Sequence, residues 1–238
     1  MANNSDSRPA QNARRPPAGD ELGEIAAKGN AHLMPQSKFP RRKIWIDGEK
    51  YILRTITIED ASDRWANWMA DPEASFMLNA PPATMTKDDI VAYIKTFDQR
   101  SHFLVGIFEK ATGKHLGFLR VDVDHASGRF LVSMLIGEPE YRNSGVTNAV
   151  TIPFRDYFFE TMGLKVMLAT ALAHNRPIIH YLYSTGWALD RTIERHVKSN
   201  LDDRMFDLCF FSQTREAWRE WKKARLGGSQ IAGPPKPK

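Results

Sequence analysis

The spacing of apolar residues divides the middle of the chain into strands and helices. Short runs rich in β-branched and aromatic residues predict strands, whereas apolar residues three or four positions apart predict one face of a helix. The predicted strands comprise two in residues 43–56, two in 102–124, and one each in 129–137, 165–173, 188–197 and 204–212. The dipeptide Asp47-Gly48 is typical of a hairpin turn and separates the first two strands.

Helical spacing recurs between and after these strands. Two stretches begin with a Thr-x-x-Asp capping box, at Thr57 and at Thr86. The predicted helices occupy residues 57–71, 86–97, 145–163, 175–187 and 214–223. We expect Pro153 to bend the third of them, because proline removes one backbone hydrogen bond. Antiparallel strands come first and strands then alternate with helices. This order predicts an α/β (α+β) fold: a mixed, mostly antiparallel central sheet flanked by helices.

Charge is concentrated at the two ends of the chain. The net charge is +5, but residues 1–43 alone carry +4 and residues 222–238 carry +5, so the middle of the chain is slightly acidic. Ends rich in Pro, Ala and Lys or Arg are typical of disordered segments. The sequence therefore predicts a disordered basic leader (1–42), a single domain (43–227) and a disordered tail (228–238).

The same charge distribution bears on partners and location. Basic tails can attract RNA or a membrane surface, but the acidic middle does not indicate a nucleic-acid-binding domain. No apolar run approaches the roughly eighteen residues that a membrane helix needs, and the first residues resemble no signal peptide. Cys209 is the only cysteine, so an internal disulfide is excluded. We expect a cytoplasmic protein without membrane or nucleic-acid partners; the sequence makes no prediction of its oligomeric state.

The stretch EYRNSGVTNAV, residues 140–150, forms the turn between a predicted strand and a predicted helix. The start of a helix presents free N–H groups and the positive end of the helix dipole, which suit a phosphate. Gly145 allows the backbone to approach such a ligand, and Asn143, Ser144 and Thr147 offer side-chain donors. The alternative interpretation is structural: Gly145 is a turn residue and Ser144 is the helix cap.

Two short motifs in the second half carry a family resemblance. Arg142 and Gly145 match an Arg-x-x-Gly-x-Gly/Ala turn in which Thr147 takes the last place, and Asn175 precedes Gly186-Trp187 by eleven positions. Over residues 44–213 the chain resembles the GNAT superfamily of acyl-CoA-dependent N-acetyltransferases. It resembles most closely the branch that acetylates ribosomal-protein N-termini (the Rim-type branch).

This resemblance implies an activity and its co-substrate. It implies an N-acetyltransferase that transfers the acetyl group of acetyl-CoA directly to a primary amine in a ternary complex, without a metal. The acceptor would be a small-molecule amine or a protein N-terminus. The alternative is a degenerate GNAT domain that binds CoA as a sensor or interaction module.

The resemblance also implies which residues form the site. The implied cofactor-binding residues are Leu135, Ile136, Gly137, Arg142, Asn143, Ser144, Gly145, Val146, Thr147 and Asn175. Where the family has the tyrosine that protonates the leaving thiolate, this chain has Leu182, which leaves the neighbouring Tyr183 as the candidate acid. Glu138, just beyond the implied thioester strand, is the candidate base.

Overall fold

The computed structural model describes residues 38–79, 83–200 and 202–226, so the predicted tail (228–238) and most of the predicted leader lie outside the described residues. The described chain forms one eight-stranded sheet in the order β1-β2-β3-β4-β5-β6-β8-β7. Its strands are β1 (Trp45–Asp47), β2 (Tyr51–Thr55), β3 (His102–Glu109), β4 (His115–Asp124), β5 (Arg129–Ile136), β6 (Val166–Leu172), β7 (Ala188–Lys198) and β8 (Met205–Thr214). All neighbouring strands are antiparallel except β5 and β6, which confirms the predicted fold class.

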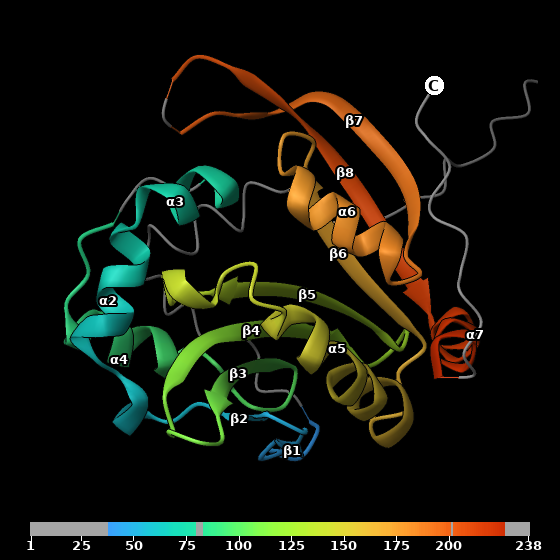
Figure 1. Cartoon of the computed structure of the whole chain (residues 1–238), viewed down its shortest axis with the longest axis horizontal. Helices are drawn as coiled ribbons and strands as arrows, with labels where there is room; N and C mark the ends of the chain where they lie inside the picture. The colour runs from blue at the N-terminus through green and yellow to red at the C-terminus, as the bar shows by residue number, and fades with distance from the viewer. Residues whose placement is uncertain (1–37, 80–82, 201, 227–238) are drawn as a thin grey trace, which may run out of the picture.

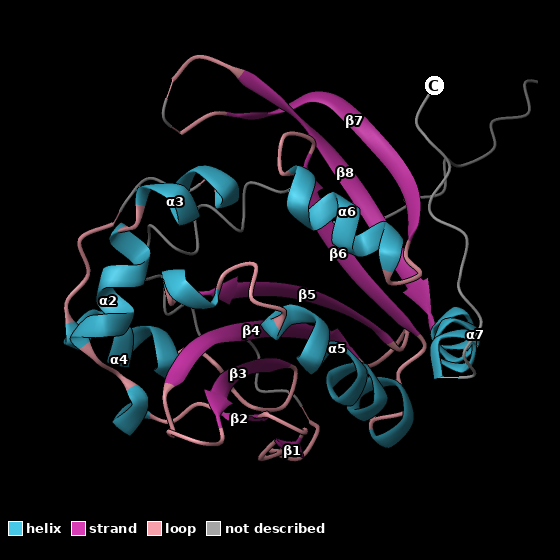
Figure 2. Ribbon diagram, viewed as in Figure 1, coloured by secondary structure: helices cyan, strands magenta, loops and turns pink. Residues whose placement is uncertain are grey.

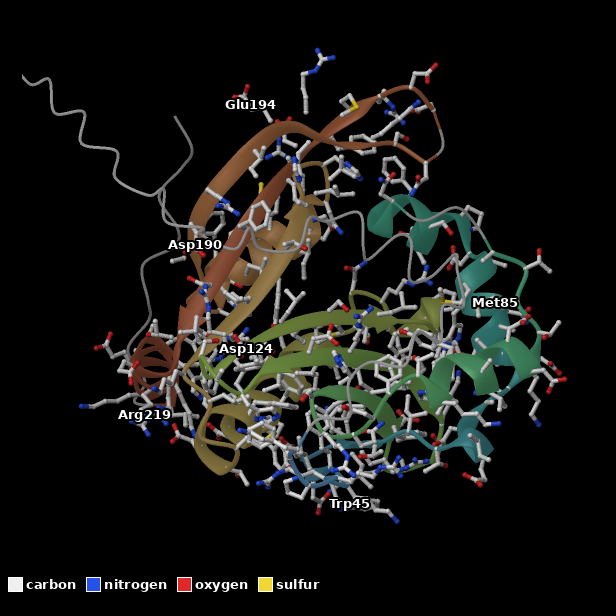
Figure 3. All side chains as sticks on the ribbon, turned by 180° about the vertical axis from the view of Figure 1, so that it is seen from behind. Trp45, Met85, Asp124, Asp190, Glu194 and Arg219 are labelled. Carbon is white, nitrogen blue, oxygen red and sulfur yellow. The ribbon has the colours of Figure 1, made fainter. Side chains whose placement is uncertain are left out.

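The sheet opens between its two parallel strands. β5 and β6 pair over only three residues of each strand, from Arg129 with Val166 to Leu131 with Leu168. Beyond this point they diverge, and β6, β8 and β7 rise away from β1–β5, as Figure 1 shows. In the view from behind, Trp45 and Glu194 mark the two far edges of the sheet (Figure 3). From residue 132 onward, the β6-facing edge of β5 has no strand partner among the described residues.

Helices cover both faces of the sheet (Figure 2). The helices are α2 (Asp63–Ala70), α3 (Pro72–Leu78), α4 (Lys87–Lys95), α5 (Val146–Asp156), α6 (Arg176–Ser184) and α7 (Arg215–Leu226), with short turns η1 (Ile58–Asp60), η2 (Pro139–Tyr141) and η3 (Tyr157–Thr161). The capping box at Thr86 begins α4 as predicted. Pro153 lies inside α5, and the irregularity follows it as the π-helical turn η3.

The single helix predicted over residues 57–71 is wrong. The capping box at Thr57 closes only the short turn η1, and the chain is extended at Ala61. Ser62 then starts α2 as a new helix by accepting a hydrogen bond from the Trp65 amide at 3.3 Å. A second helix, α3, follows at once and was not predicted. Asp71 starts it by accepting a hydrogen bond from the Glu73 amide at 2.9 Å.

Strand alternation assigns the core residues to two faces. On one face, α5 packs against Leu119, Met134 and Ile136 in the larger hydrophobic cluster. On the other face, α2 and α4 pack against Phe118 and Leu135 in a second cluster. Successive side chains of a strand point to opposite faces, so β4 and β5 contribute to both clusters. The two faces of β5 thus lie in different surroundings.

The described chain begins to pack on this core before the predicted domain boundary. The Phe39 ring stacks on His125 with 3.8 Å between ring centroids, and the Arg42 amide donates to the Gln99 carbonyl at 2.8 Å. Phe39 and Arg42, which the composition assigns to the leader, therefore contact the β4–β5 turn and the loop before β3, respectively.

Candidate active site

The opening between β5 and β6 holds a cavity of about 980 Å³. Its walls come from α2 and α4 on one side, β4, β5 and β6 in the middle, and the first turns of α5 and α6 on the other side. It reaches residues on both faces of β5, for example Met134 on the α5 face and Ser133 on the α2 face. The residues described below are placed relative to this cavity.

The turn before α5 lies on the cavity wall with its helix start uncapped. Gly145 is the N-cap with φ 90°, Asn143 is also left-handed with φ 59°, and no side chain caps the helix. The Ser144 hydroxyl instead donates to the Tyr141 carbonyl at 2.7 Å, so Ser144 is not the cap. The first turn of α5 contains no acidic residue, and a Cβ added at Gly145 meets no atom within 4 Å. Open space therefore faces a helix start whose N–H groups lack a side-chain acceptor.

The Arg142 side chain is engaged by protein groups on the cavity wall. It pairs with Asp71 at 2.5 Å and with Glu73 at 2.9 Å. It also donates to the carbonyls of Ile136 and Gly137, both at 3.1 Å. Burial acts to raise the pKa of Asp71, but hydrogen bonds from Arg142 and from backbone amides outweigh it and the pKa is lowered. Arg142 thus ties the end of β5 and the turn before α5 to the start of α3.

The end of β5 is closely packed on its β4 side. The Gly137 amide donates to the Leu116 carbonyl of β4 at 2.9 Å. Because N–H directions alternate along a strand, the Ile136 amide points to the opposite edge, toward the cavity. A Cβ at Gly137 would lie 2.0 Å from the Trp68 ring, and one at Gly117 would lie 2.1 Å from the Leu135 carbonyl oxygen. Only glycine fits at these two positions, and the strand end is held rigidly against α2 and β4.

Helix α6 brings Asn175 and one of its two tyrosines to the cavity. Asn175 caps the helix by accepting from the Ile178 amide at 3.4 Å and also lines the cavity. Tyr181 lines the cavity as well, and so does Leu182, whose side chain is otherwise buried in the core. Tyr183 is 40% exposed, packs edge-on against Phe211 of β8 and does not line the cavity.

A buried arginine supports Tyr181. Arg155 of α5 is 1% exposed and donates to the Tyr181 hydroxyl at 3.3 Å. It also donates to the Thr185 carbonyl at 2.8 Å and to Gln213 at 2.9 Å, and no carboxylate among the described residues pairs with it. Burial lowers the pKa of Arg155. The Tyr181 hydroxyl lies within 2.5 Å of the Thr151 hydroxyl, which donates to the Thr147 carbonyl.

The structure does not bring Glu138 to the cavity. Its carboxylate is 6% exposed, accepts from the Trp68 indole N–H at 2.9 Å and pairs with Lys114 at 2.6 Å. The hydrogen bonds that Lys114 donates to Glu138 and Glu140 raise its pKa to about 12. Glu138 therefore joins the end of β5 to α2 and to the start of β4. The sequence contains no signal for this contact, because the two partners lie 70 and 24 positions away.

Sequence reasoning missed Tyr181, Arg155 and Arg120, all of which line the cavity. A signal existed for Tyr181, because it lies three positions after Ile178 and so shares a helix face with it. No comparable signal marks the two arginines. Among the described residues, no group of three or more His, Cys, Asp or Glu is placed to hold a metal ion. None of the described helices is long and apolar enough to span a membrane.

Comparison with known proteins identifies the family. The acetyltransferase (GNAT) domain family matches residues 50–187, more than half of the chain, and the chain belongs to this family. No curated protein matched the sequence. Membership supports acetyl transfer as the general activity, with acetyl-CoA or CoA as the cofactor of the family.

Solved structures share the fold. A GCN5-related N-acetyltransferase from Brucella melitensis has a TM-score of 0.65 at 17% identity and covers 84% of this chain and 90% of its own. A spermidine N-acetyltransferase from Vibrio cholerae, solved with CoA and spermine, has a TM-score of 0.63 at 13% identity. The match covers 71% of this chain and 98% of that protein. A GNAT-family acetyltransferase from Bacillus anthracis has a TM-score of 0.62 at 14% identity, and the match covers 73% of this chain and 99% of that protein. At these identities the likeness concerns the fold.

Proposed function

We propose that this protein is an N-acetyltransferase that transfers the acetyl group of acetyl-CoA directly to a primary amine while both are bound. The observation that carries this proposal is the continuous cavity, which runs from the start of α5 past the open edge of β5 to the α2 face of the sheet. A thioester held at that edge is accessible to an amine bound on the other face. Direct transfer requires this juxtaposition and no covalent enzyme intermediate.

The turn before α5 is the proposed pyrophosphate site. Among the described residues no side chain caps its first-turn amides, the first turn itself carries no acidic residue, and space is open in front of Gly145. An anion placed there gains several N–H donors and the positive end of the helix dipole. The proposed contacts are the backbone and side chains of Asn143, Ser144, Gly145, Val146 and Thr147. Because Arg142 is already bound to two carboxylates, its proposed role is to hold this turn in place.

The end of β5 and the start of α6 are the proposed site for the thioester and the pantetheine arm. Among Leu135, Ile136 and Gly137, the Ile136 amide points to the open edge and is the proposed donor to the thioester carbonyl. Such a donor stabilises the negative charge that develops on that oxygen during amine attack. Asn175 lines the cavity opposite β5 and is the proposed contact to the arm.

Tyr181 is the proposed acid for the leaving thiolate, in place of Tyr183. It is the α6 tyrosine on the cavity wall, and Arg155 donates to its oxygen. Because the Thr151 hydroxyl donates elsewhere, the phenol proton lies toward Thr151 and would turn from it to the thiolate. The acceptor ammonium would lose its proton to water, because Glu73, the only carboxylate that lines the cavity among the described residues, is paired with Arg142. Glu138 then has a supporting role through Trp68 and Lys114.

A matched pair of glycine variants tests the cofactor site. Gly145→Asp and Gly113→Asp both place a carboxylate at a left-handed position with no protein atom within 4 Å of the new Cβ. The backbone strain is therefore similar, but only Gly145 faces the proposed pyrophosphate. We expect calorimetry to show acetyl-CoA binding weakened at least about tenfold in Gly145→Asp, through charge repulsion, and unchanged in Gly113→Asp. Equal affinity of the two variants would remove the pyrophosphate site from the proposal.

A second pair of variants tests the chemistry. CoA release with a panel of amines should fall about a hundredfold in kcat for Tyr181→Phe and stay unchanged for Tyr183→Phe, because only the first removes a hydroxyl from the cavity. Acetyl-CoA affinity should be similar in both. If acetyl-CoA binds but no amine releases CoA, the chain is the CoA-binding sensor or interaction module considered above.

A further inference from the structure

The α2 face of the sheet presents one arginine to the cavity. Arg120 of β4 pairs across the ladder with Ser133 of β5, two positions along each strand from the pair formed by Phe118 and Leu135. Phe118 and Leu135 belong to the cluster formed with α2 and α4, and side chains two positions apart share a face. Arg120 therefore lies on the face opposite α5 and opposite the proposed pyrophosphate site.

The Arg120 guanidinium is only partly used by the protein. Its Nε atom donates to one oxygen of Asp122 at 2.8 Å, and the other oxygen of Asp122 accepts from His102 at 2.7 Å. The hydrogen bond to Asp122 raises the pKa of His102, so this carboxylate is shared between two basic groups. The two terminal nitrogens of Arg120 make no hydrogen bond to the described residues. They remain available to an anion in the cavity.

The wall of the cavity on the α2 side is apolar and aromatic. Its side chains include Trp65 and Met69 of α2, Met85 just before α4, Tyr93 of α4, and Phe118 of β4. Figure 3 shows Met85 among the helices that cover this side of the sheet. Burial raises the pKa of Tyr93 to about 12, so its phenol stays neutral at every physiological pH. These rings and thioethers suit a large apolar body.

The charges around the cavity disfavour a polycation. In the part of the chain that the structure describes, Glu73 is the one carboxylate that lines it, and Arg142 pairs with it at 2.9 Å. Arg120 and Lys198 are further cations on the wall. An amine with several positive charges would meet no free carboxylate there, whereas an amine that also carries a negative charge would meet Arg120.

We propose that the acceptor is an amine that also carries a carboxylate and a bulky apolar or aromatic body, such as a large apolar amino acid. Its carboxylate binds the terminal nitrogens of Arg120, and its body packs between α2, α4 and Phe118. The assignment of this compound as an acceptor rests on the proposed acetyltransferase function. The binding preference itself rests only on the geometry of Arg120 and the surrounding wall.

Matched pairs of amines with and without a carboxylate test this preference by binding. Calorimetry on the full chain loaded with CoA would compare tyrosine with tyramine and tryptophan with tryptamine, with spermidine as the polycation. We expect each amino acid to bind at least about tenfold tighter than its decarboxylated partner, the size of a charged hydrogen bond. Spermidine should bind more weakly than either amino acid.

Variants then assign the preference to Arg120. Arg120→Gln should abolish the discrimination within each pair while leaving tyramine and CoA affinities unchanged, and Arg120→Lys should retain part of it. Arg219→Gln, which changes an arginine paired with Glu160 on the far side of the molecule, is the matched control and should behave as the wild type.

Each outcome decides the inference. Equal binding within the wild-type pairs, tighter binding of spermidine, or a preference that survives in Arg120→Gln would overturn it, and the first two need no variant. CoA release is read separately with the same amines. A carboxylate preference without CoA release would leave the binding inference standing and would refute the enzyme function.

Discussion

His115 is expected to make this protein sensitive to mild acid. The imidazole stacks on Phe108 with 4.6 Å between ring centroids and meets the rings of Trp65 and Trp68 edge-on at 5.3 and 5.0 Å. Its Nε2 atom donates to the Gly117 carbonyl at 3.0 Å, and its buried Nδ1 atom has no partner among the described residues. A second proton would therefore be placed among aromatic rings without an acceptor.

Burial lowers the pKa of His115 from 6.5 to about 4, and the attraction of Asp60 only partly opposes this shift. The unfolded chain therefore binds a proton at His115 below pH 6.5, while the folded chain does not bind it until about pH 4. The contribution of His115 to the free energy of unfolding is therefore complete above pH 6.5 and declines as the pH falls from 6.5 toward 4. A pKa shift of this size corresponds to at most about 3 kcal/mol in the free energy of unfolding. The remaining solvent contact of the ring makes the actual contribution smaller.

The assay is urea unfolding of the wild type and of His115→Gln at several pH values between 4.5 and 7.5. Glutamine keeps a donor for the Gly117 carbonyl but takes up no proton, so the free energy of unfolding should fall less steeply with acidification in the variant. The difference in free energy of unfolding between the wild type and His115→Gln should therefore shrink by roughly 2 kcal/mol between pH 7 and pH 4.5. The exposed residue His196 provides the control, because His196→Gln should leave the wild-type slope unchanged. Parallel curves for the wild type and His115→Gln would refute the reasoning.

His102 acts with the opposite sign in the same pH range. The hydrogen bond to Asp122 raises its pKa in the folded state, despite some burial. Its contribution to stability is therefore complete below its unfolded pKa of about 6.5 and is lost as the pH rises through the raised folded value. This term partly masks the His115 effect in the wild type, but it is common to the wild type and His115→Gln and cancels in their difference.

Three further substitutions test other parts of the structure. Gly137→Ala should lower the free energy of unfolding by about 2 kcal/mol, because its Cβ would lie 2.0 Å from the buried Trp68 ring; an unchanged urea midpoint would contradict this packing. Arg155→Lys should destabilise by about 2 kcal/mol or more in the same assay, since one ammonium cannot reach all of the groups that the guanidinium now serves; Arg219→Lys should cost little. Asn175→Asp keeps the α6 cap and should change stability by less than about 1 kcal/mol while weakening acetyl-CoA binding in calorimetry; unchanged affinity would leave Asn175 as a cap only.

Local patterns in the sequence were enough to predict most of the secondary structure. The hairpin at Asp47-Gly48, the capping box at Thr86 and the strand-to-helix turn at Gly145 all occur where the sequence places them. Each of them depends on residues within a few positions of one another, through turn geometry, capping and strand alternation. The order of the strands and helices in turn restricts the sheet to a mixed, mostly antiparallel one.

Local rules failed where capping and helical spacing compete to decide where a helix begins and ends. Residues 57–71 carry apolar residues at helical spacing, but the hydroxyl of Ser62 and the carboxylate of Asp71 each start a new helix. A capping residue inside a periodic stretch was thus a stronger signal than the periodicity itself.

The site depended on contacts that only the tertiary structure makes. Tyr181 and Tyr183 are two positions apart in the sequence, which places them on different sides of a helix, but the packing of α6 decides which of them meets the cavity. Likewise, the sequence offered Glu138 as a carboxylate beyond β5, and the fold pairs it with Lys114 and Trp68. A side chain's role depends on its surroundings, and these come from segments far apart in the chain. Propensity acts over a few residues, whereas burial and charge pairing act across the whole fold.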